Sequence, residues 1–310
     1  MPCFHPLQAW KTEDGIKFYN PYKDNRHHKG IQIPCRQCTG CRSEYSRQWA
    51  MRNVHEASLH DRNVFITLTY DNDHLPLLGP SEEHNTLVKD HFRLFIKSLR
   101  KPHKKLGWVP PKKIRFYMCG EYGEKGTKRP HYHAILFNTY FPDMVPLEGK
   151  KNLFTSEILR QIWGKGHVSV GAVTFESAAY VSKYVQKKIN GQKKDEHYRV
   201  IDKETGEYLG QRQQEYANMS RRPGIAGDWL AKYKDRVYQT DYITINGRKM
   251  RPPKYYDRIY EIDHRDKMEE IKKNRKKEME KMSHLFTKEA LLYREKVHKA
   301  RMSLYQKDKL

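Results

Sequence analysis

The chain has 310 residues, which is enough for one large domain or two smaller ones with a real hydrophobic core. Lys and Arg outnumber Asp and Glu by 60 to 37, and the net charge of +23 indicates a polyanionic partner, nucleic acid first and an anionic membrane surface second. With no apolar run of 18 residues and no secretory signal, we expect neither a membrane span nor secretion, although a general basic protein, such as a ribosome-associated one, also fits this composition.

Four of the five cysteines lie in the first 41 residues, which we expect to be loop-like and to belong to a Cys-rich segment, residues 1–45. An odd number of cysteines without a secretory signal argues against a disulfide framework. Cys35, Cys38 and Cys41 form a C-x-x-C-x-x-C pattern, which together with Cys3 favours a structural zinc site. Iron–sulfur ligation, free thiols, and His5 in place of Cys3 are the alternatives.

A helix, a strand and a second helix follow the cysteines. Residues 42–60 predict a helix, and residues 63–70 (NVFITLTY) predict a strand because they are β-branched and aromatic. Residues 86–101 carry apolar side chains at helical spacing with basic residues opposite them. The first helix also offers candidate contacts to a DNA backbone: Arg42, Arg47 and Arg52.

The middle of the chain alternates strands and helices. Residues 114–123 and the strand beginning at Pro130 are separated by a short polar loop, which favours an antiparallel hairpin. Cys119, in the first of these strands, is typical of a small core residue. Further elements are expected as follows: a helix at 156–163 capped by Ser or Thr, a strand at 166–173, a helix at 174–190 capped by Thr174, a polar insertion or hairpin at 190–215, a hairpin turn at Asn246–Gly247, and one or two exposed helices in a charged tail, 256–310.

Two histidines stand two residues apart at the start of an apolar strand, in "KRPHYHAILF". Residues i and i+2 of a strand point to the same face, so His131 and His133 can bind one divalent ion. Glu121 ends the preceding strand and is the favoured third ligand, with Glu124 as its rival. Such a triad leaves open coordination positions, as a catalytic metal requires, but a His-x-His pattern alone is a weak signal.

The helix after residue 174 carries two tyrosines one turn apart. At 100° per residue, Tyr180 and Tyr184 share one side with Lys183 and Lys187, and the aliphatic residues lie nearly opposite. Phenols beside ammonium groups suit nucleophiles at a phosphate, because positive charge favours the phenolate. Exposed tyrosines without a role are the alternative.

Together these motifs resemble those of the HUH endonucleases, the rolling-circle replication initiators. The resemblance rests on the strand NVFITLTY, Glu121, His131-Tyr132-His133 and Tyr180-x-x-Lys183-Tyr184, in that order, over about residues 30–230. The cysteine-rich start and "MSRRPGI" are similar to the initiators of gokushoviruses, in the microvirus family. Tyr132 departs from the family pattern, which has a bulky hydrophobic residue there.

The resemblance implies an α/β (α+β) sandwich at 46–255: a mainly antiparallel sheet of the ferredoxin-like or RRM-like type, with helices on one side and the histidine strand central. It also implies a mechanism. Mg²⁺ or Mn²⁺ on His131, His133 and Glu121 polarises a phosphate of a single-stranded origin, and one tyrosine attacks, leaving a 5′-phosphotyrosine and a free 3′-OH. Host polymerase extends that end, the second tyrosine rejoins the displaced circle, and Lys183 steadies the phosphate or the phenolate. The implied setting is the cytoplasm of a bacterial host, and a host helicase is a further expected partner.

Three alternatives remain open from the sequence. A relaxase or transposase would share the chemistry. A His-x-His metallohydrolase acting on a small molecule would explain the histidines but neither the charge nor the tyrosines. A non-catalytic, zinc-containing DNA-binding protein would explain the cysteines and the charge but leave the histidine pair idle.

Overall fold

The computed structural model describes residues 3–22, 30–123, 128–184 and 194–307. The chain divides into two compact units: a sheet unit, Gln48–Tyr256, and a second unit that combines Met1–Arg47 with Asp257–Leu310. From the sequence we expected three segments, with borders near residues 45 and 255. The difference is that the Cys-rich segment and the charged tail share one unit, because residues of the tail pack on the start of the chain.

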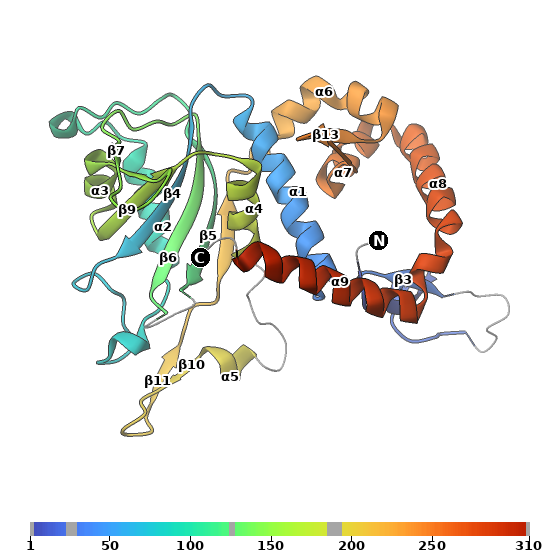
Figure 1. The fold of residues 1–310 in the computed structure, drawn as a ribbon, viewed down its shortest axis with the longest axis horizontal. Coiled ribbons are helices and arrows are strands. Elements are labelled where there is room, and N and C mark those ends of the chain that lie inside the picture. The colour runs from blue at the N-terminus through green and yellow to red at the C-terminus, as the bar shows by residue number, and fades with distance from the viewer. Residues whose placement is uncertain (1–2, 23–29, 124–127, 185–193, 308–310) are drawn as a thin grey trace. The chain divides into compact units, whose positions relative to one another are not determined.

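The sheet unit is built on a seven-stranded sheet in the order β12-β5-β6-β4-β9-β8-β7 (Figure 1). Every pairing described in this sheet is antiparallel. The expectation of a mixed α/β fold around a mainly antiparallel sheet is therefore confirmed, and the histidine strand lies centrally between β5 and β4. The strands are β12 (Tyr216–Met219), β5 (Arg115–Tyr122), β6 (Pro130–Phe137), β4 (Asn63–Tyr70), β9 (Gly166–Gly171), β8 (Phe154–Thr155) and β7 (Val145–Pro146).

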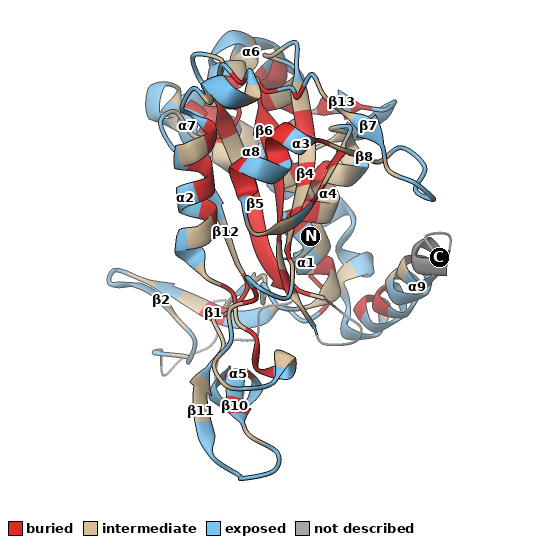
Figure 2. Ribbon diagram, turned by 90° about the vertical axis from the view of Figure 1, so that its left-hand side faces the viewer, coloured by how far each residue is buried: buried red, intermediate tan, exposed pale blue. Residues whose placement is uncertain are grey.

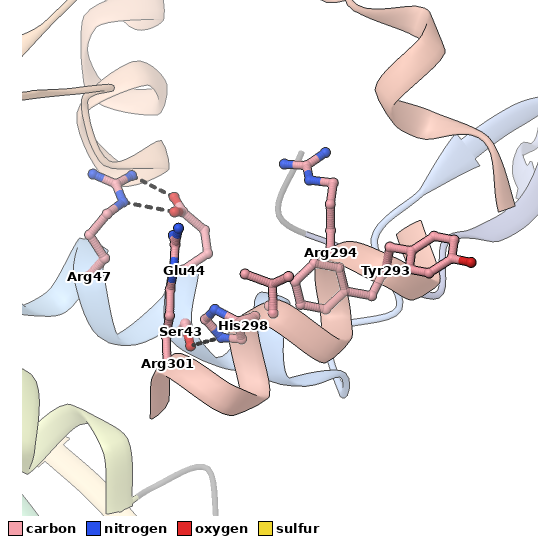
Figure 3. Close-up of a pocket in the computed structure, with 10 residues that line it drawn as sticks. Ser43, Glu44, Arg47, Tyr293, Arg294, His298 and Arg301 are labelled. Atoms are coloured by element: carbon pink, nitrogen blue, oxygen red, sulfur yellow. Dashed lines mark hydrogen bonds and ion pairs between the residues drawn. The ribbon is translucent and has the colours of Figure 1, made fainter. Parts of the chain in front are cut away.

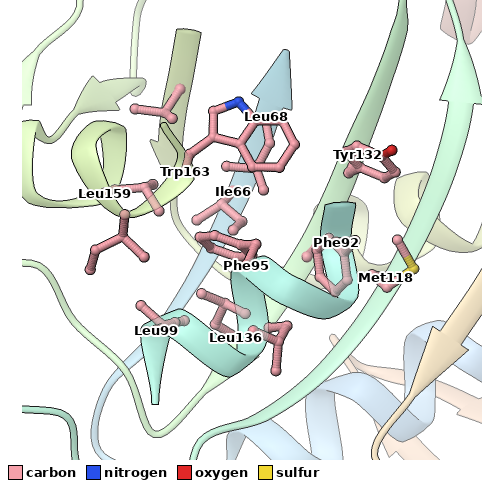
Figure 4. Packing of buried hydrophobic residues seen from close by; sticks show 14 of the residues in the cluster. Ile66, Leu68, Phe92, Phe95, Leu99, Met118, Tyr132, Leu136, Leu159 and Trp163 are labelled. Atoms are coloured by element: carbon pink, nitrogen blue, oxygen red, sulfur yellow. The ribbon is translucent and has the colours of Figure 1, made fainter. Parts of the chain in front are cut away.

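One face of the sheet packs against α2 (Lys89–Leu99) and α3 (Glu157–Trp163). Phe92, Phe95 and Leu99 of α2 belong to one buried cluster with Ile66 and Leu68 of β4, and Figure 4 shows Phe95 beside Ile66. Ile66 and Leu68 are two residues apart on β4, so their side chains point to the same face of the sheet. Such burial stabilises the unit by about 1.5–3 kcal/mol for each large apolar side chain. The predicted helical spacing of residues 86–101 is confirmed.

The opposite face packs against α1 (Thr39–Ala57) and α4 (Phe175–Tyr184). Ala50 of α1 and Ala178 and Val181 of α4 join Ile135 and Phe137 of β6 in a second buried cluster. The expectation that helices cover one side only was wrong. The reason is that buried residues run along β5 and β6 on both faces, and the second face includes the apolar side chains of Tyr117, Ile135 and Phe137 (Figure 2).

The local predictions for this unit hold where the structure describes the chain, whereas residues 185–193, which belong to the predicted helix 174–190 and the predicted insertion 190–215, lie outside the described residues. The strand at 63–70 has the predicted bounds, and β5 and β6 form the predicted hairpin. Ser156 caps α3 by accepting a hydrogen bond from the Leu159 N–H, and the Thr174 hydroxyl accepts one from the Ser177 N–H. The insertion is a hairpin of β10 (Arg199–Ile201) and β11 (Tyr208–Gln211) after α5 (Lys194–Tyr198). Beyond it come α6 (Gly227–Thr240) and the hairpin predicted at Asn246–Gly247, of β13 (Ile243–Ile245) and β14 (Arg248–Met250).

The second unit contains a small sheet in the order β2-β1-β3, of β1 (Leu7–Thr12), β2 (Gly15–Lys17) and β3 (Ile31–Ile33). The expectation of a loop-like start was therefore wrong, because long-range pairing orders these short segments. In the part of the tail that the structure describes, up to Lys307, there are three α-helices instead of the one or two expected: α7 (Lys254–Asp263, beginning in the sheet unit), α8 (Arg265–Lys281) and α9 (Lys288–Lys307). In the described residues, no helix combines the length and the apolar character needed to span a bilayer.

Candidate functional site

Strand pairing brings the three predicted metal ligands together. Glu121 on β5 lies opposite His131 on β6, and His133 follows two residues later on the same face. The Glu121 Oε1 atom is 3.0 Å from His131 Nε2 and 3.1 Å from His133 Nε2. The carboxylate is 1% exposed, so the sheet positions these groups in a nearly dry environment. The rival ligand, Glu124, lies outside the described residues.

The outer nitrogen of each imidazole is also held. His131 Nδ1 is 3.1 Å from the Arg129 carbonyl oxygen, which can only accept, so Nδ1 carries the hydrogen. A neutral ring then turns the lone pair of Nε2 toward the carboxylate. Thr67 Oγ1 is 2.9 Å from His133 Nδ1 and allows the same orientation. Lone pairs and a carboxylate that converge in this way require a cation between them, either a proton or a metal ion.

The electrostatics of Glu121 fit a charged ligand. Burial by itself raises the pKa of the Glu121 carboxyl, but the hydrogen bonds and charges of His131 and His133 outweigh it and leave this pKa below its usual value. The ligand atoms of these three residues all lie within 4.8 Å of one another. A triad of one carboxylate and two imidazoles can therefore hold a divalent ion with positions left for substrate.

Tyr180 reaches this triad from helix α4. Its ring centroid is 5.2 Å from that of His133, in an edge-to-face arrangement, and 6.3 Å from that of Phe65. Ala178 and Val181 are fully buried and fix α4 on the sheet face that carries the histidines. The predicted convergence of a phenol and the histidine pair is therefore present for Tyr180.

The other predicted residues of this helix are described less completely. Lys183 is exposed. Tyr184 is the last residue of α4, but its side chain, and the whole of Lys187, lie outside the described part of the chain. The structure thus places one of the two tyrosines at the triad.

The four N-terminal cysteines also come together. The sulfur atoms of Cys3, Cys35, Cys38 and Cys41 lie within 4.8 Å of one another, and all four are free thiols. Burial by itself raises the pKa of the Cys38 thiol, but hydrogen bonds from the Phe4 and Cys41 N–H groups and from the neighbouring thiols lower it to about 6. The chain thus carries two clusters that can hold a metal: one of thiols, and one of a carboxylate and two imidazoles.

Residues 63–189 match the family model "Replication-associated protein ORF2/G2P". The chain is 32% identical over 274 residues to "Replication-associated protein VP4" of Bdellovibrio phage phiMH2K, an alignment that covers 86% of this chain and 79% of that protein. The chain belongs to the family of phage replication-associated proteins. This finding confirms the resemblance to microvirus-type rolling-circle initiators.

Two further members of the family support the assignment. The chain is 31% identical to "Replication-associated protein ORF2" of Spiroplasma virus 4, with 89% of this chain and 86% of that protein covered. It is also 31% identical to "Replication-associated protein ORF4" of Chlamydia phage 1, with 72% and 52% covered. No solved structure matches the chain. The stretch matched by the family model contains Glu121, both histidines and both tyrosines.

The arginines of helix α1 differ in their environments. Arg42 is exposed, and Arg47 forms a bidentate ion pair with Glu44 at 2.5–2.7 Å. Arg52 is buried: its guanidinium donates to the Ile225 carbonyl and stacks between the rings of Trp49 and Tyr255. The expectation that Arg52 contacts DNA is corrected, because its donors and both its faces are used inside the sheet unit.

Sequence reasoning missed Thr67 and Arg129 as partners of the histidines. Thr67 belongs to the motif strand 63–70 and shares its face with Phe65, so its orientation followed from the two-residue period. What the sequence did not contain was the register that sets Thr67 opposite His133. Arg129 contributes a carbonyl group, which carries no residue-specific signal.

Proposed function

We propose that this protein is an HUH-type initiator of rolling-circle DNA replication, which nicks and rejoins single-stranded origin DNA through a tyrosine. The single observation that carries this proposal is the position of the Tyr180 ring, 5.2 Å from the ring of His133, whose Nε2 shares the Glu121 carboxylate with His131. The protein thus combines a candidate nucleophile beside a candidate metal site with a net positive charge that suits binding to DNA. The sheet would be of the ferredoxin-like or RRM-like type that the resemblance implies.

The residues divide the chemistry between them. Glu121, His131 and His133 would hold Mg²⁺ or Mn²⁺, which when bound would supply a Lewis acid for the scissile phosphate. The phenolic oxygen of Tyr180 or Tyr184 forms a bond to phosphorus, its proton goes to solvent, and the bond to the 3′ oxygen breaks. That oxygen leaves as a 3′-OH, and the 5′-phosphate stays on the tyrosine. Lys183 faces solvent, where its ammonium group can steady the phosphate or the phenolate.

The second tyrosine would complete the cycle. Host DNA polymerase extends the 3′-OH, and a host helicase separates the strands. The second phenol then attacks phosphorus at the regenerated origin and releases a new 3′-OH. That hydroxyl attacks the first phosphotyrosine, which breaks the bond between tyrosine and phosphorus, frees the first phenol and joins the displaced strand into a circle. Arg42, Arg47 and Lys187 remain the candidates for contacts to the DNA backbone; Lys187 lies outside the described residues. The site of action would be the cytoplasm of the bacterial host.

The test is incubation of the protein with a labelled single-stranded origin oligonucleotide and Mn²⁺. We expect a covalent protein–DNA band that survives detergent. This band should be lost in the double variant Tyr180→Phe/Tyr184→Phe and in His131→Ala. The matched control is Tyr208→Phe, because Tyr208 lies exposed on β11. A band that persists in the double variant would show that the nucleophile is another residue.

The cysteine cluster and the high positive charge favour a second candidate, a non-catalytic DNA-binding protein containing zinc. This candidate predicts that the oligonucleotide is retarded in a native gel but never becomes covalently attached. A relaxase or transposase would instead yield the covalent band on its own target sequence, so a panel of oligonucleotides from the phage origin and from unrelated DNA separates these cases.

A further inference from the structure

The fold of the second unit depends on very little buried apolar surface. Among the described residues of its first 47, the buried apolar side chains are those of Cys3, Phe4 and Ala9. In the described part of α9 the buried residues are Leu291 and Glu295. Segments this poor in core need another source of stability, for which disulfides and metal ions are the usual solutions. The chain offers four free thiols in the same unit.

We propose that Cys3, Cys35, Cys38 and Cys41 bind one structural zinc ion, and that this ion holds in place the N-terminal residues on which helix α9 packs. The site is separate from the Glu121 triad, so this inference goes beyond the proposed function and does not rest on it.

The sulfur geometry fits a single ion. Four sulfurs about 2.3 Å from a zinc ion at the corners of a tetrahedron are about 3.8 Å apart. The Cys3 and Cys35 sulfurs are 3.7 Å apart, and no pair among the four exceeds 4.8 Å. An iron–sulfur cluster places several ions and sulfides between the thiolates and spreads their sulfurs further apart. The compact arrangement therefore favours one ion over a cluster.

The backbone around the cysteines is arranged for thiolates. The Cys35 N–H donates to Cys3 Sγ at 3.3 Å, and the Cys38 N–H donates to Cys35 Sγ at 3.3 Å. Cys38 Sγ accepts two such bonds, from the Phe4 N–H at 3.3 Å and from the Cys41 N–H at 3.5 Å. Hydrogen bonds of this kind stabilise negative sulfur and fix the direction of each ligand.

The structure also decides between Cys3 and His5 as the fourth ligand. His5 Nε2 is 2.7 Å from Glu295 Oε2 on α9, whereas Cys3 lies in the cluster. Four thiolates fill the tetrahedral positions of zinc and leave none for a substrate, which makes the site structural instead of catalytic.

The contacts of α9 begin at the residues next to the cluster. Phe4 and His5 directly follow Cys3: the Phe4 ring is 5.5 Å from that of His298, and His5 binds Glu295. Ser43, two residues after Cys41, is 3.0 Å from His298 Nε2 through its hydroxyl (Figure 3). Loss of the ion would free residues 3–5 and remove the platform for α9.

The first experiment measures metal in the full chain, purified without chelator. We expect one zinc per chain by mass spectrometry of the metal, released on modification of the thiols. The Cys38→Ser variant should lose the zinc. Its matched control is Cys119→Ser, because Cys119 is buried in β5 and belongs to the core. His131→Ala should keep the zinc, which assigns it to the thiols and not to the carboxylate–histidine triad.

The second experiment follows α9 by hydrogen–deuterium exchange. Removal of zinc, by chelation of the wild-type protein or by Cys38→Ser, should speed exchange in residues 288–304 at least tenfold while the strands of the sheet unit stay protected. Absence of zinc, stoichiometric iron with visible colour, or equal zinc in Cys38→Ser and Cys119→Ser would overturn the metal assignment. Unchanged exchange in α9 after zinc loss would overturn the role given to the ion. Chelation of the wild-type chain keeps both tests valid if the variant fails to fold.

Discussion

At His133, the Thr67 hydroxyl contacts a proposed metal ligand. Thr67 Oγ1 is 2.9 Å from His133 Nδ1, on the side of the ring opposite the nitrogen that faces Glu121, and His133 is only 5% exposed. We expect Thr67→Val to weaken Mn²⁺ binding at the Glu121 triad by about 10–100-fold, because outer partners of metal-bound histidines fix tautomer and direction. Titration calorimetry of the metal-stripped site measures this.

The matched variant is Thr67→Ser, which keeps the hydroxyl and should restore most of the affinity. Equal Mn²⁺ affinity in Thr67→Val and the wild-type protein would show that the hydroxyl has no orienting role. That outcome would leave the nicking proposal intact, because the triad itself would still bind metal.

His55 couples stability to pH. It stacks on Trp229 at 3.5 Å and its Nδ1 is 2.7 Å from the Tyr256 hydroxyl; burial lowers its pKa to about 3. Because the unfolded chain takes up this proton near pH 6.5, the stability due to neutral His55 is complete above pH 6.5 and is lost as pH falls toward 3.

We expect the free energy of unfolding to decrease over this window by about 1.4 kcal/mol per pH unit from this residue alone. In His55→Gln the decrease should be shallower by that amount. Urea unfolding followed by tryptophan fluorescence measures it, since Trp229 contacts the ring. Identical pH slopes in the variant and the wild-type protein would contradict the assignment.

At the scale of elements, the start of β9 depends on a missing side chain. Gly166 has φ +129°, and a Cβ there would lie 2.2 Å from the Asp71 nitrogen and 2.7 Å from the Thr69 carbonyl oxygen. Both atoms are backbone and cannot rotate away. Gly166→Ala should therefore lower the free energy of unfolding by at least about 3 kcal/mol, because the backbone is strained and the ends of strands β4 and β9 are pushed apart.

The control is Gly164→Ala, two residues earlier at the end of α3. Gly164 also has a left-handed backbone conformation, at φ +59°, but the atom nearest to an added Cβ is 3.5 Å away. Its cost should be about 1 kcal/mol, from the backbone conformation alone. Thermal unfolding of the two variants separates the cost of the left-handed backbone, which both share, from the cost of the Cβ clash, which only Gly166→Ala has. Equal losses of unfolding free energy would contradict the clash.

At the scale of the whole molecule, charge sets the affinity for DNA. With a net charge of +23, binding to single-stranded DNA should be driven largely by release of counterions. If about five phosphates are contacted, affinity should fall about 100-fold between 50 and 200 mM salt. Fluorescence anisotropy with a labelled oligonucleotide measures the slope. An affinity that hardly changes with salt would argue that base stacking on aromatic side chains carries the binding instead.

The sequence by itself determined the features that depend on local spacing. Neighbours a few residues apart set the strand 63–70, the hairpin whose second strand carries His131 and His133, the caps at Ser156 and Thr174, and the C-x-x-C-x-x-C spacing of Cys35, Cys38 and Cys41. Turn chemistry, β-branched content and two- or four-residue periods act over such distances. The candidate site could be named from the chain for the same reason.

Only the tertiary structure decided what depends on pairing between distant segments. Thr67 meets His133 across 66 residues, Arg52 meets the Ile225 carbonyl across 173, and Cys3 joins Cys35 across 32. These contacts follow from strand register and from how helices cover both faces of the sheet, which no local pattern encodes. Arg52 belongs to the core because its guanidinium finds a buried hydrogen-bond acceptor there, the Ile225 carbonyl. Cys3 belongs to the thiol cluster, whereas His5 pairs with Glu295 instead.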